Sequence, residues 1–285
     1  MRSGPGAVPV LLALGIASSS WTVPALAAES RTTLQSDLFA RAAPGGVMLV
    51  TSVYRRWGLE DGASPLLRDR YVQLGASVGV NPAYTQGGPH VEWQPLAVLQ
   101  LRAQYDFYGF FGANGALLRF PSASSRFGGS EIDAASGSAT GGLGQRLLLT
   151  PVLRARVGPV VLRSQTDLGW FFLSPGGSWF YDWEYDTLIA RHDFVVSNRS
   201  AVLCELWRGT GEAALMAGPG YEVIHAAKVG ITRQRAEAVV FWSPVVRFGV
   251  FARPRAFAVA GVNLVDRNRA GDPFGVFGVG ADLDL

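Results

Sequence analysis

Residues 99–108 read LQLRAQYDFY, and this stretch decides the fold class. Apolar and polar side chains alternate along it with a period of two, as they do when a strand points successive side chains to opposite faces. One face carries Leu99, Leu101, Ala103, Tyr105 and Phe107, and the other carries Gln100, Arg102, Gln104, Asp106 and Tyr108. The pattern predicts an amphipathic β-strand.

The same alternation recurs along the chain, at residues 73–80, 153–157, 162–170 and 277–285. Only two segments compete as helices: residues 30–41, which would end before Pro44-Gly45-Gly46, and residues 183–191. Neither segment carries enough apolar surface to organise a fold. The sequence therefore predicts an all-β protein.

Composition excludes several classes of protein. Of the 285 residues, 48% are hydrophobic and 16% are charged, and this charged share is below the roughly 25% of ordinary soluble domains. A chain so rich in apolar residues is not disordered. A net charge of +3 is too small for a nucleic-acid surface. Cys204 is the single cysteine, so no intrachain disulfide can form.

The first 27 residues have the features of a signal peptide. Arg2 precedes a short apolar core at residues 8–17, and Ala25-Leu26-Ala27 supplies the small residues of a cleavage site. The alternative, an N-terminal membrane anchor, would need a longer uninterrupted apolar run. We expect residues 1–27 to be removed, residues 28–45 to form a short periplasmic segment, and the folded domain to span residues 46–285.

The length of the strands and the nature of their two faces indicate a membrane. Residues 93–108 and 160–173 exceed the five or six residues of an average strand and satisfy the 9–11 tilted residues that cross a bilayer. Aromatic side chains such as Trp93 and Trp170 lie near predicted strand ends. Because no water pairs with the backbone inside hydrocarbon, such a sheet must close on itself. These features predict a transmembrane barrel that turns its apolar face outward.

In this pattern the chain resembles small, single-chain bacterial outer-membrane β-barrel proteins, although it matches no narrower family. The last strand, residues 277–285, is similar to the insertion signal of that class, except that Leu285 stands where an aromatic residue is usual. The resemblance implies a closed antiparallel up-and-down barrel in the outer membrane. It also implies contact with outer-membrane lipid and lipopolysaccharide, recognition of the last strand by the insertion machinery, and a monomer.

Ten strands are expected, near residues 47–57, 69–84, 91–108, 145–157, 160–172, 194–206, 213–223, 235–243, 254–265 and 274–285. The count becomes twelve if residues 179–190 and 245–251 add strands. Short connections, including Gln86–Pro89, then fall in the periplasm. Long ones fall outside, including residues 58–68 and a loop rich in glycine and serine at about 110–143.

Charged residues on the polar faces are the candidate lining of the lumen: Arg102, Asp106, Arg154, Arg156, Arg163, Asp167, Asp282 and Asp284. The first interpretation is a structural lattice that fills a narrow interior. The second is a selectivity ring for an anionic solute. Acidic residues interleave with the arginines, which favours the lattice.

Evidence for catalysis is thin, and we assign no catalytic, cofactor-binding or metal-binding residue. His192 beside Asp193, and His225 after Glu222, both fall near predicted outer loops, whereas His90 lies beside a predicted periplasmic turn. Three dispersed histidines and one cysteine do not have the spacing of metal ligands. An enzyme at the outer rim and a soluble exported β-sandwich remain the alternatives to a structural, surface-interaction or narrow-pore barrel.

One further hypothesis concerns the predicted loop at residues 266–273. Arg267 and Arg269 could contact lipopolysaccharide phosphates through charge-assisted hydrogen bonds. The simpler interpretation is a solvated turn, since exposed arginines need no partner.

Overall fold

The computed structural model describes residues 30–43, 45–60, 62–208, 215–244, 247–248 and 251–285. The expected signal peptide, residues 1–27, lies outside them. None of the helices in this part of the chain is long and apolar enough to cross a membrane.

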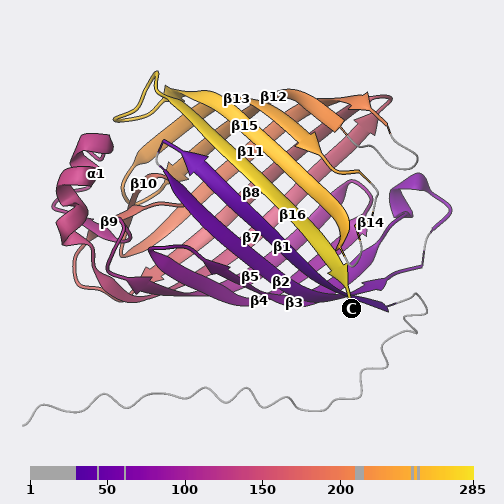
Figure 1. The fold of residues 1–285 in the computed structure, drawn as a ribbon, viewed down its shortest axis with the longest axis horizontal. Coiled ribbons are helices and arrows are strands. Elements are labelled where there is room, and N and C mark those ends of the chain that lie inside the picture. Colours follow the sequence, from indigo (N-terminus) through magenta and orange to yellow (C-terminus); the bar gives the residue numbers. More distant parts are fainter. Residues whose placement is uncertain (1–29, 44, 61, 209–214, 245–246, 249–250) are drawn as a thin grey trace, which may run out of the picture.

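Twelve strands of the described chain form one closed antiparallel barrel (Figure 1). They are β1 (Ser30–Ala42), β2 (Gly46–Gly58), β3 (Tyr71–Val80), β4 (Tyr84–Leu96), β5 (Leu99–Phe111), β7 (Gly141–Val157), β8 (Val160–Leu173), β11 (His192–Trp207), β12 (Leu215–Ala226), β13 (Ile231–Trp242), β15 (Phe251–Val265) and β16 (Pro273–Asp284). Each strand pairs with the next, and β16 closes the barrel by pairing with β1 from Thr33↔Asp284 to Ala42↔Gly275. The all-β, up-and-down barrel is therefore confirmed.

The preferred count of ten strands is wrong. The barrel has the twelve strands of the alternative count, but the two additional strands come from other residues than 179–190 and 245–251. The first additional strand is β1, which was expected to lie in a periplasmic segment or a short helix. Its residues alternate after all, with Thr33 buried on the inner face and Leu38 exposed on the outer one. This strand closes the barrel, so the folded domain begins near residue 30 and not at residue 46.

The second additional strand arises because the first predicted turn was misplaced. Residues 86–89 lie inside β4, where the α-carbon of Gly88 comes so close to β5 that a Cβ there would lie 1.8 Å from the Tyr105 carbonyl oxygen. The actual turn follows Asn81, whose side chain accepts hydrogen bonds from the backbone N–H groups of Ala83 and Tyr84 at 2.8 Å each. A second turn at residues 97–98 then separates β4 from β5.

Neither segment proposed for the twelve-strand alternative supplies a barrel strand. Within residues 179–190, β9 (Trp179–Asp182) and β10 (Thr187–Ala190) instead join β6 (Leu118–Phe120) in a separate three-stranded sheet. At residues 245–251, the two-residue β14 (Arg247–Phe248) pairs with β15, and residues 245–246 and 249–250 lie outside the described residues.

Because β1 precedes it, β2 crosses the barrel in the direction opposite to the one predicted when residues 47–57 were taken as the first strand. Residues 59–70, which include the short helix η1 (Pro65–Leu67), therefore connect β2 to β3 at the end that carries Ser30 and Leu285, here called the termini end. They were expected among the long loops at the opposite end. That loop end carries residues 112–140, with α1 (Gly129–Ala135) and η2 (Ser136–Ser138), and residues 174–191.

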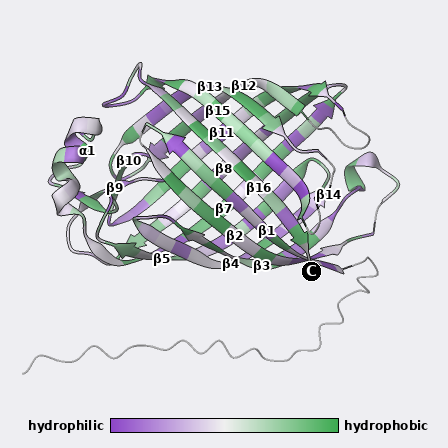
Figure 2. Ribbon diagram, in the orientation of Figure 1, coloured by the Kyte–Doolittle hydropathy of each residue, from purple (hydrophilic) through white to green (hydrophobic). Residues whose placement is uncertain are grey.

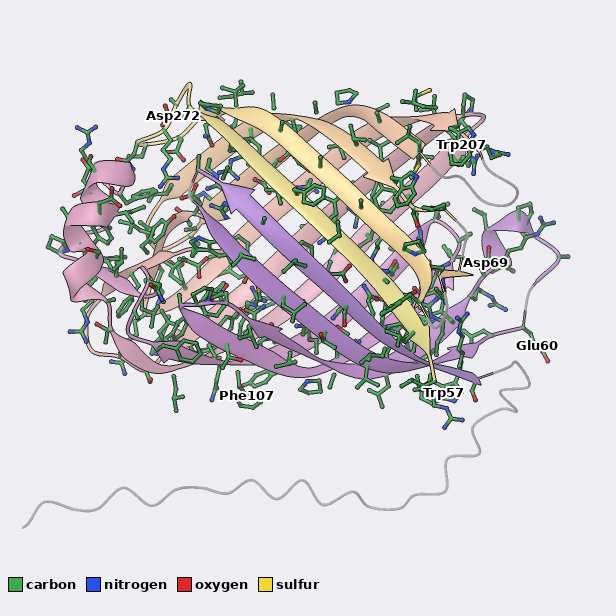
Figure 3. All side chains as sticks on the ribbon, in the orientation of Figure 1. Trp57, Glu60, Asp69, Phe107, Trp207 and Asp272 are labelled. Carbon is green, nitrogen blue, oxygen red and sulfur yellow. The ribbon has the colours of Figure 1, made fainter. Side chains whose placement is uncertain are left out.

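The barrel turns its apolar side chains outward. On β3, the outward-facing side chains of Leu74 and Val78 are 56% and 49% exposed. Gln73, which faces the lumen from the same strand, is 4% exposed. Figure 2 shows the resulting alternation of hydrophobic and hydrophilic residues along the strands. In Figure 3, Phe107 points away from the barrel wall, and Trp57 and Trp207 lie near the termini end, as expected for aromatic residues at a membrane boundary.

A hydrophobic core closes the loop end. Phe127, Leu188 and Ile189 from the loops have no exposed surface and pack in one cluster with Phe171 and Val195 of the barrel wall. Residues 112–140 and 174–191 therefore form a folded cap, where a loop rich in glycine and serine was expected at about 110–143. We refer to these two segments as the loop-end cap.

Candidate functional site

The inner surface of the barrel carries a network of charged side chains, and its centre is a residue of the cap. Asp186 lies between β9 and β10 and is 1% exposed. Its carboxylate contacts the guanidinium groups of Arg233, Arg235 and Arg269 at 3.1 Å each and that of Arg41 at 3.4 Å. Because buried charges require partners, these contacts fix the cap to the barrel wall.

A second link joins the cap to the opposite part of the wall. Arg146 of β7 is 2% exposed and contacts Asp106 of β5 at 2.9 Å and Glu184 of the cap at 2.8 Å. Arg102 continues this network, since it donates to Gln104 at 2.6 Å and Gln104 donates to Asp106 at 2.5 Å. The predicted candidates Arg102 and Asp106 thus lie in one network, together with Arg146.

The remaining candidates lie in three other places on the inner face. Asp282 contacts Arg255 at 2.7 Å, and Arg255 also contacts Asp37 at 2.7 Å, which ties β15 and β16 to β1. Arg156, near the termini end, pairs with Glu205. Arg154, Arg163 and Asp167 belong to the wall formed by β7 and β8. The side chain of Asp284 lies outside the described part of the structure.

Sequence reasoning missed the residues around Asp186. The alternation along β13 could have identified Arg233, Arg235 and Glu237 as residues of one face. They face inward and are 2%, 4% and 6% exposed. No local pattern marks Asp186, because its partners come from β1, β13 and the loop after β15. Arg269, considered as a ligand of lipopolysaccharide phosphate, is 7% exposed and faces Asp186 instead. Arg267 donates to the Ala123 carbonyl of the cap.

The histidines are not brought together. His192 is exposed and lies 5.8 Å from the ring of Phe172, between ring centroids. His225 pairs with Val196 in the register of β11 and β12, four residues along from His192, and its Nδ1 lies 2.9 Å from the hydroxyl of Thr232. His90 lies within β4, facing the lumen and 2% exposed, and not beside a periplasmic turn. The three histidines therefore do not form one common site.

Below the cap the lumen contains a cavity of about 300 Å³. Charged residues of its lining include Asp167, Arg199 and Glu222, and aromatic residues include Trp183, Tyr185 and Phe257. No group of three or more potential metal-ligating side chains occurs in the described ranges. The cavity is therefore a mixed polar and aromatic chamber, lined on the loop side by residues 183–185.

The cap should be sensitive to pH through Asp182 of β9. Burial, and next the nearby Glu184 carboxylate, raise the pKa of Asp182 to about 7 from an ordinary value of 3.8. A carboxyl group with a raised pKa binds its proton more tightly in the folded state, so its contribution to stability is lost as the pH rises from about 4 to about 7. We expect amides of residues 174–191 to exchange faster at pH 8 than at pH 5, after correction for intrinsic rates.

The substitution Asp182→Asn provides the control, because its side-chain oxygen can still accept the 2.8 Å hydrogen bond from the Tyr185 N–H. This variant should lose most of the pH dependence. An equal dependence in the variant would assign the effect to other groups.

No protein-family model and no curated protein matches the sequence. Among solved structures, the fold is similar to that of the KdgM porin, with 8% identity over 89% of this chain and 99% of that chain and a TM-score of 0.41. It is also similar to the β domain of the Bordetella autotransporter BrkA (10% identity, 90% and 99% coverage, TM-score 0.44) and to the NanC porin (8%, 88% and 100%, TM-score 0.40). The chain folds as a closed antiparallel β-barrel. Any role of its lumen must be argued from its own residues.

Proposed function

We propose that the protein is an integral outer-membrane β-barrel whose lumen is a narrow pore, closed in this conformation by the loop-end cap. The observation that carries the proposal is the position of Asp186. A loop residue with four arginine partners from the wall and the last loop holds the cap inside the mouth of the barrel.

The outer surface supports the membrane location. It exposes large apolar side chains on strands around the whole barrel, among them Leu49, Leu74, Phe107, Val202 and Phe277, which are 48%, 56%, 54%, 48% and 51% exposed. Such a surface is unfavourable in water and favourable against acyl chains. The closed ladder of strands leaves no edge unpaired, which a bilayer requires.

The inner surface supports a passage and not a solid core. The lumen keeps a cavity of about 300 Å³ below the cap, with Asp167, Arg199 and Glu222 in its lining. Arg199 of the wall keeps 49% of its side chain exposed although it points inward. The structural lattice therefore describes the loop end of the lumen, where ion pairs fill the interior. The pore describes the part below it, where open space remains.

The proposal includes the path to the membrane and the surroundings there. Residues 1–27 would direct export, and β16 would be recognised by the insertion machinery, because Phe277, Val279 and Leu283 alternate along it on the outer face. The loop end would then face outward, beside lipopolysaccharide, and the termini end would face the periplasm. We propose a monomer, since the closed barrel is complete within one chain.

Conductance across a planar bilayer tests this function. The purified wild-type chain is expected to be closed for most of the time, with rare openings. The variant Asp186→Asn, which weakens the attachment of the cap, is expected to conduct steadily. A folded and inserted variant that stays closed although proteases now cleave residues 174–191 would contradict the pore and favour a purely structural barrel.

A further inference from the structure

Three arginines on neighbouring strands line the open part of the lumen. They are Arg154 of β7, Arg163 of β8 and Arg199 of β11, and all three are exposed although their strands turn them inward. Arg154 and Arg163 lie three positions from Val157↔Val160, the last pair before the 158–159 turn. The group is therefore nearer to the termini end than to the cap.

Arg154 and Arg163 are direct cross-strand partners in the register of β7 and β8. Side chains in this relation have their Cβ atoms about 4.5–5.5 Å apart, and two like charges placed so are destabilising. In the described residues, no carboxylate forms an ion pair with either of them. The charges that act on Arg163 are those of Arg199, Asp167 and Arg154, so two of the three are also positive.

Glutamines occupy the places that carboxylates take elsewhere in the lumen. Arg163 donates to the Oε1 atom of Gln165 at 2.5 Å, and Arg154 donates to that of Gln94. By contrast, Arg146 contacts Asp106 and Arg255 contacts Asp282. A neutral amide oxygen orients a guanidinium group without cancelling its charge. The wall thus holds two oriented positive charges that form no ion pair with a carboxylate among the described residues.

The acidic groups close to this wall are already engaged. Asp167 accepts hydrogen bonds from Thr150 at 2.7 Å and from Gln165 at 3.2 Å. Glu222 and Glu237 both pair with Arg199 on its far side, and Glu222 also contacts Arg235 at 3.3 Å. None of these carboxylates bridges Arg154 and Arg163.

We propose that Arg154 and Arg163 form a binding site for an oxyanion, a phosphate, sulfate or carboxylate group of a small solute, with Arg199 beside it. Two adjacent guanidinium forks suit an oxyanion, because each fork donates paired N–H groups to its oxygens. An anion between the two arginines relieves their repulsion. Since the cap seals the loop end, the solute reaches the site from the termini end. This inference names the class of solute that the proposed pore would carry, and in that respect it rests on the proposed function. Binding itself can be measured without conduction.

The test is a calorimetric titration of the refolded full-length protein in detergent at low ionic strength, with inorganic sulfate as the probe. The decisive variant is Gln165→Glu, which keeps the shape of residue 165 and places a carboxylate on Arg163. We expect it to weaken sulfate binding at least about tenfold, as does loss of a charge-assisted hydrogen bond. The double variant Arg154→Gln/Arg163→Gln should abolish binding. Arg119→Gln, which removes an exposed arginine of β6, is the charge-matched control and should change affinity less than about twofold.

Thermal unfolding gives a second measurement on the same proteins. Sulfate should raise the unfolding temperature of the wild-type chain and of Arg119→Gln, but not that of Gln165→Glu. Gln165→Glu should be at least as stable as wild type without sulfate, because it neutralises a repelling pair. Sulfate binding that is absent in wild type, or equal in wild type and Gln165→Glu, would overturn the site. Binding as expected without any conductance in Asp186→Asn would overturn the pore and leave the site standing.

Discussion

Replacing Asp186 with asparagine is expected to release the cap and open the lumen. The substitution preserves size and tolerates the left-handed backbone at this position, where φ is +50°. It removes the carboxylate that Arg233, Arg235, Arg269 and Arg41 share at 3.1–3.4 Å. Loss of one partner from a buried ion pair costs about 3–5 kcal/mol when the remaining charge is left without compensation. Arg233 and Arg235 keep contacts with Glu222 at 3.6 and 3.3 Å, so the largest loss is expected at Arg41 and Arg269.

The effect should appear in two measurements. Steady conductance should replace rare openings, and proteases should cleave residues 174–191 in the variant at concentrations that spare the wild type. Asp133→Asn, which removes an exposed carboxylate of α1, is the matched control and should change neither. A variant as closed and as resistant as wild type would show that the hydrophobic core of the cap suffices without Asp186.

An arginine introduced at residue 76 is expected to destabilise the barrel strongly. Ala76 lies at the middle of β3 on the outer face, between the exposed residues Leu74 and Val78. If this face meets acyl chains, a charge at mid-depth costs about 2–4 kcal/mol. The free energy of unfolding, measured by urea titration in lipid vesicles, should fall by that amount in Ala76→Arg.

The same substitution at the end of the strand is the control. Val80 is the last residue of β3 and is 48% exposed on the same face. Near the membrane boundary the cost drops to about 0–1 kcal/mol. Equal effects at residues 76 and 80 would mean that the outer surface has no depth profile and does not lie in a bilayer.

The alternation of side chains was sufficient to predict the barrel, but local turn signals misled the strand count. Leu74, Phe107 and Val279 are exposed on the outer face as the period of two required. Gly87-Gly88-Pro89 has the composition of a turn, yet Gly88 serves a close approach of β4 to the Tyr105 carbonyl of β5. In β1, hydroxyl residues on both faces, Thr33 inside and Ser36 outside, obscured the alternation, and its pairing with β2 and β16 defines the strand.

The sequence was sufficient to predict that polar side chains line the lumen. It was not sufficient to predict which of them contact one another. The placement of Arg102 and Asp106 on one face follows from spacing along β5. The pairing of Arg255 with Asp37 joins residues 218 positions apart, and the partners of Asp186 lie on other elements. Contacts of this kind depend on how the sheet closes and how the cap folds into it. No periodicity within a segment encodes them.

Spin labels at two neighbouring positions test most directly whether the apolar face meets lipid. Ser77 faces the lumen, and Val78 faces outward with 49% exposure. Single cysteines at these positions, in a Cys204→Ser chain reconstituted in vesicles, carry the label. The account predicts that the label at residue 78 collides with oxygen dissolved in the bilayer and is shielded from a water-soluble nickel chelate. The label at residue 77 should be shielded from bilayer oxygen. Ready access of the nickel chelate to residue 78 would contradict the account.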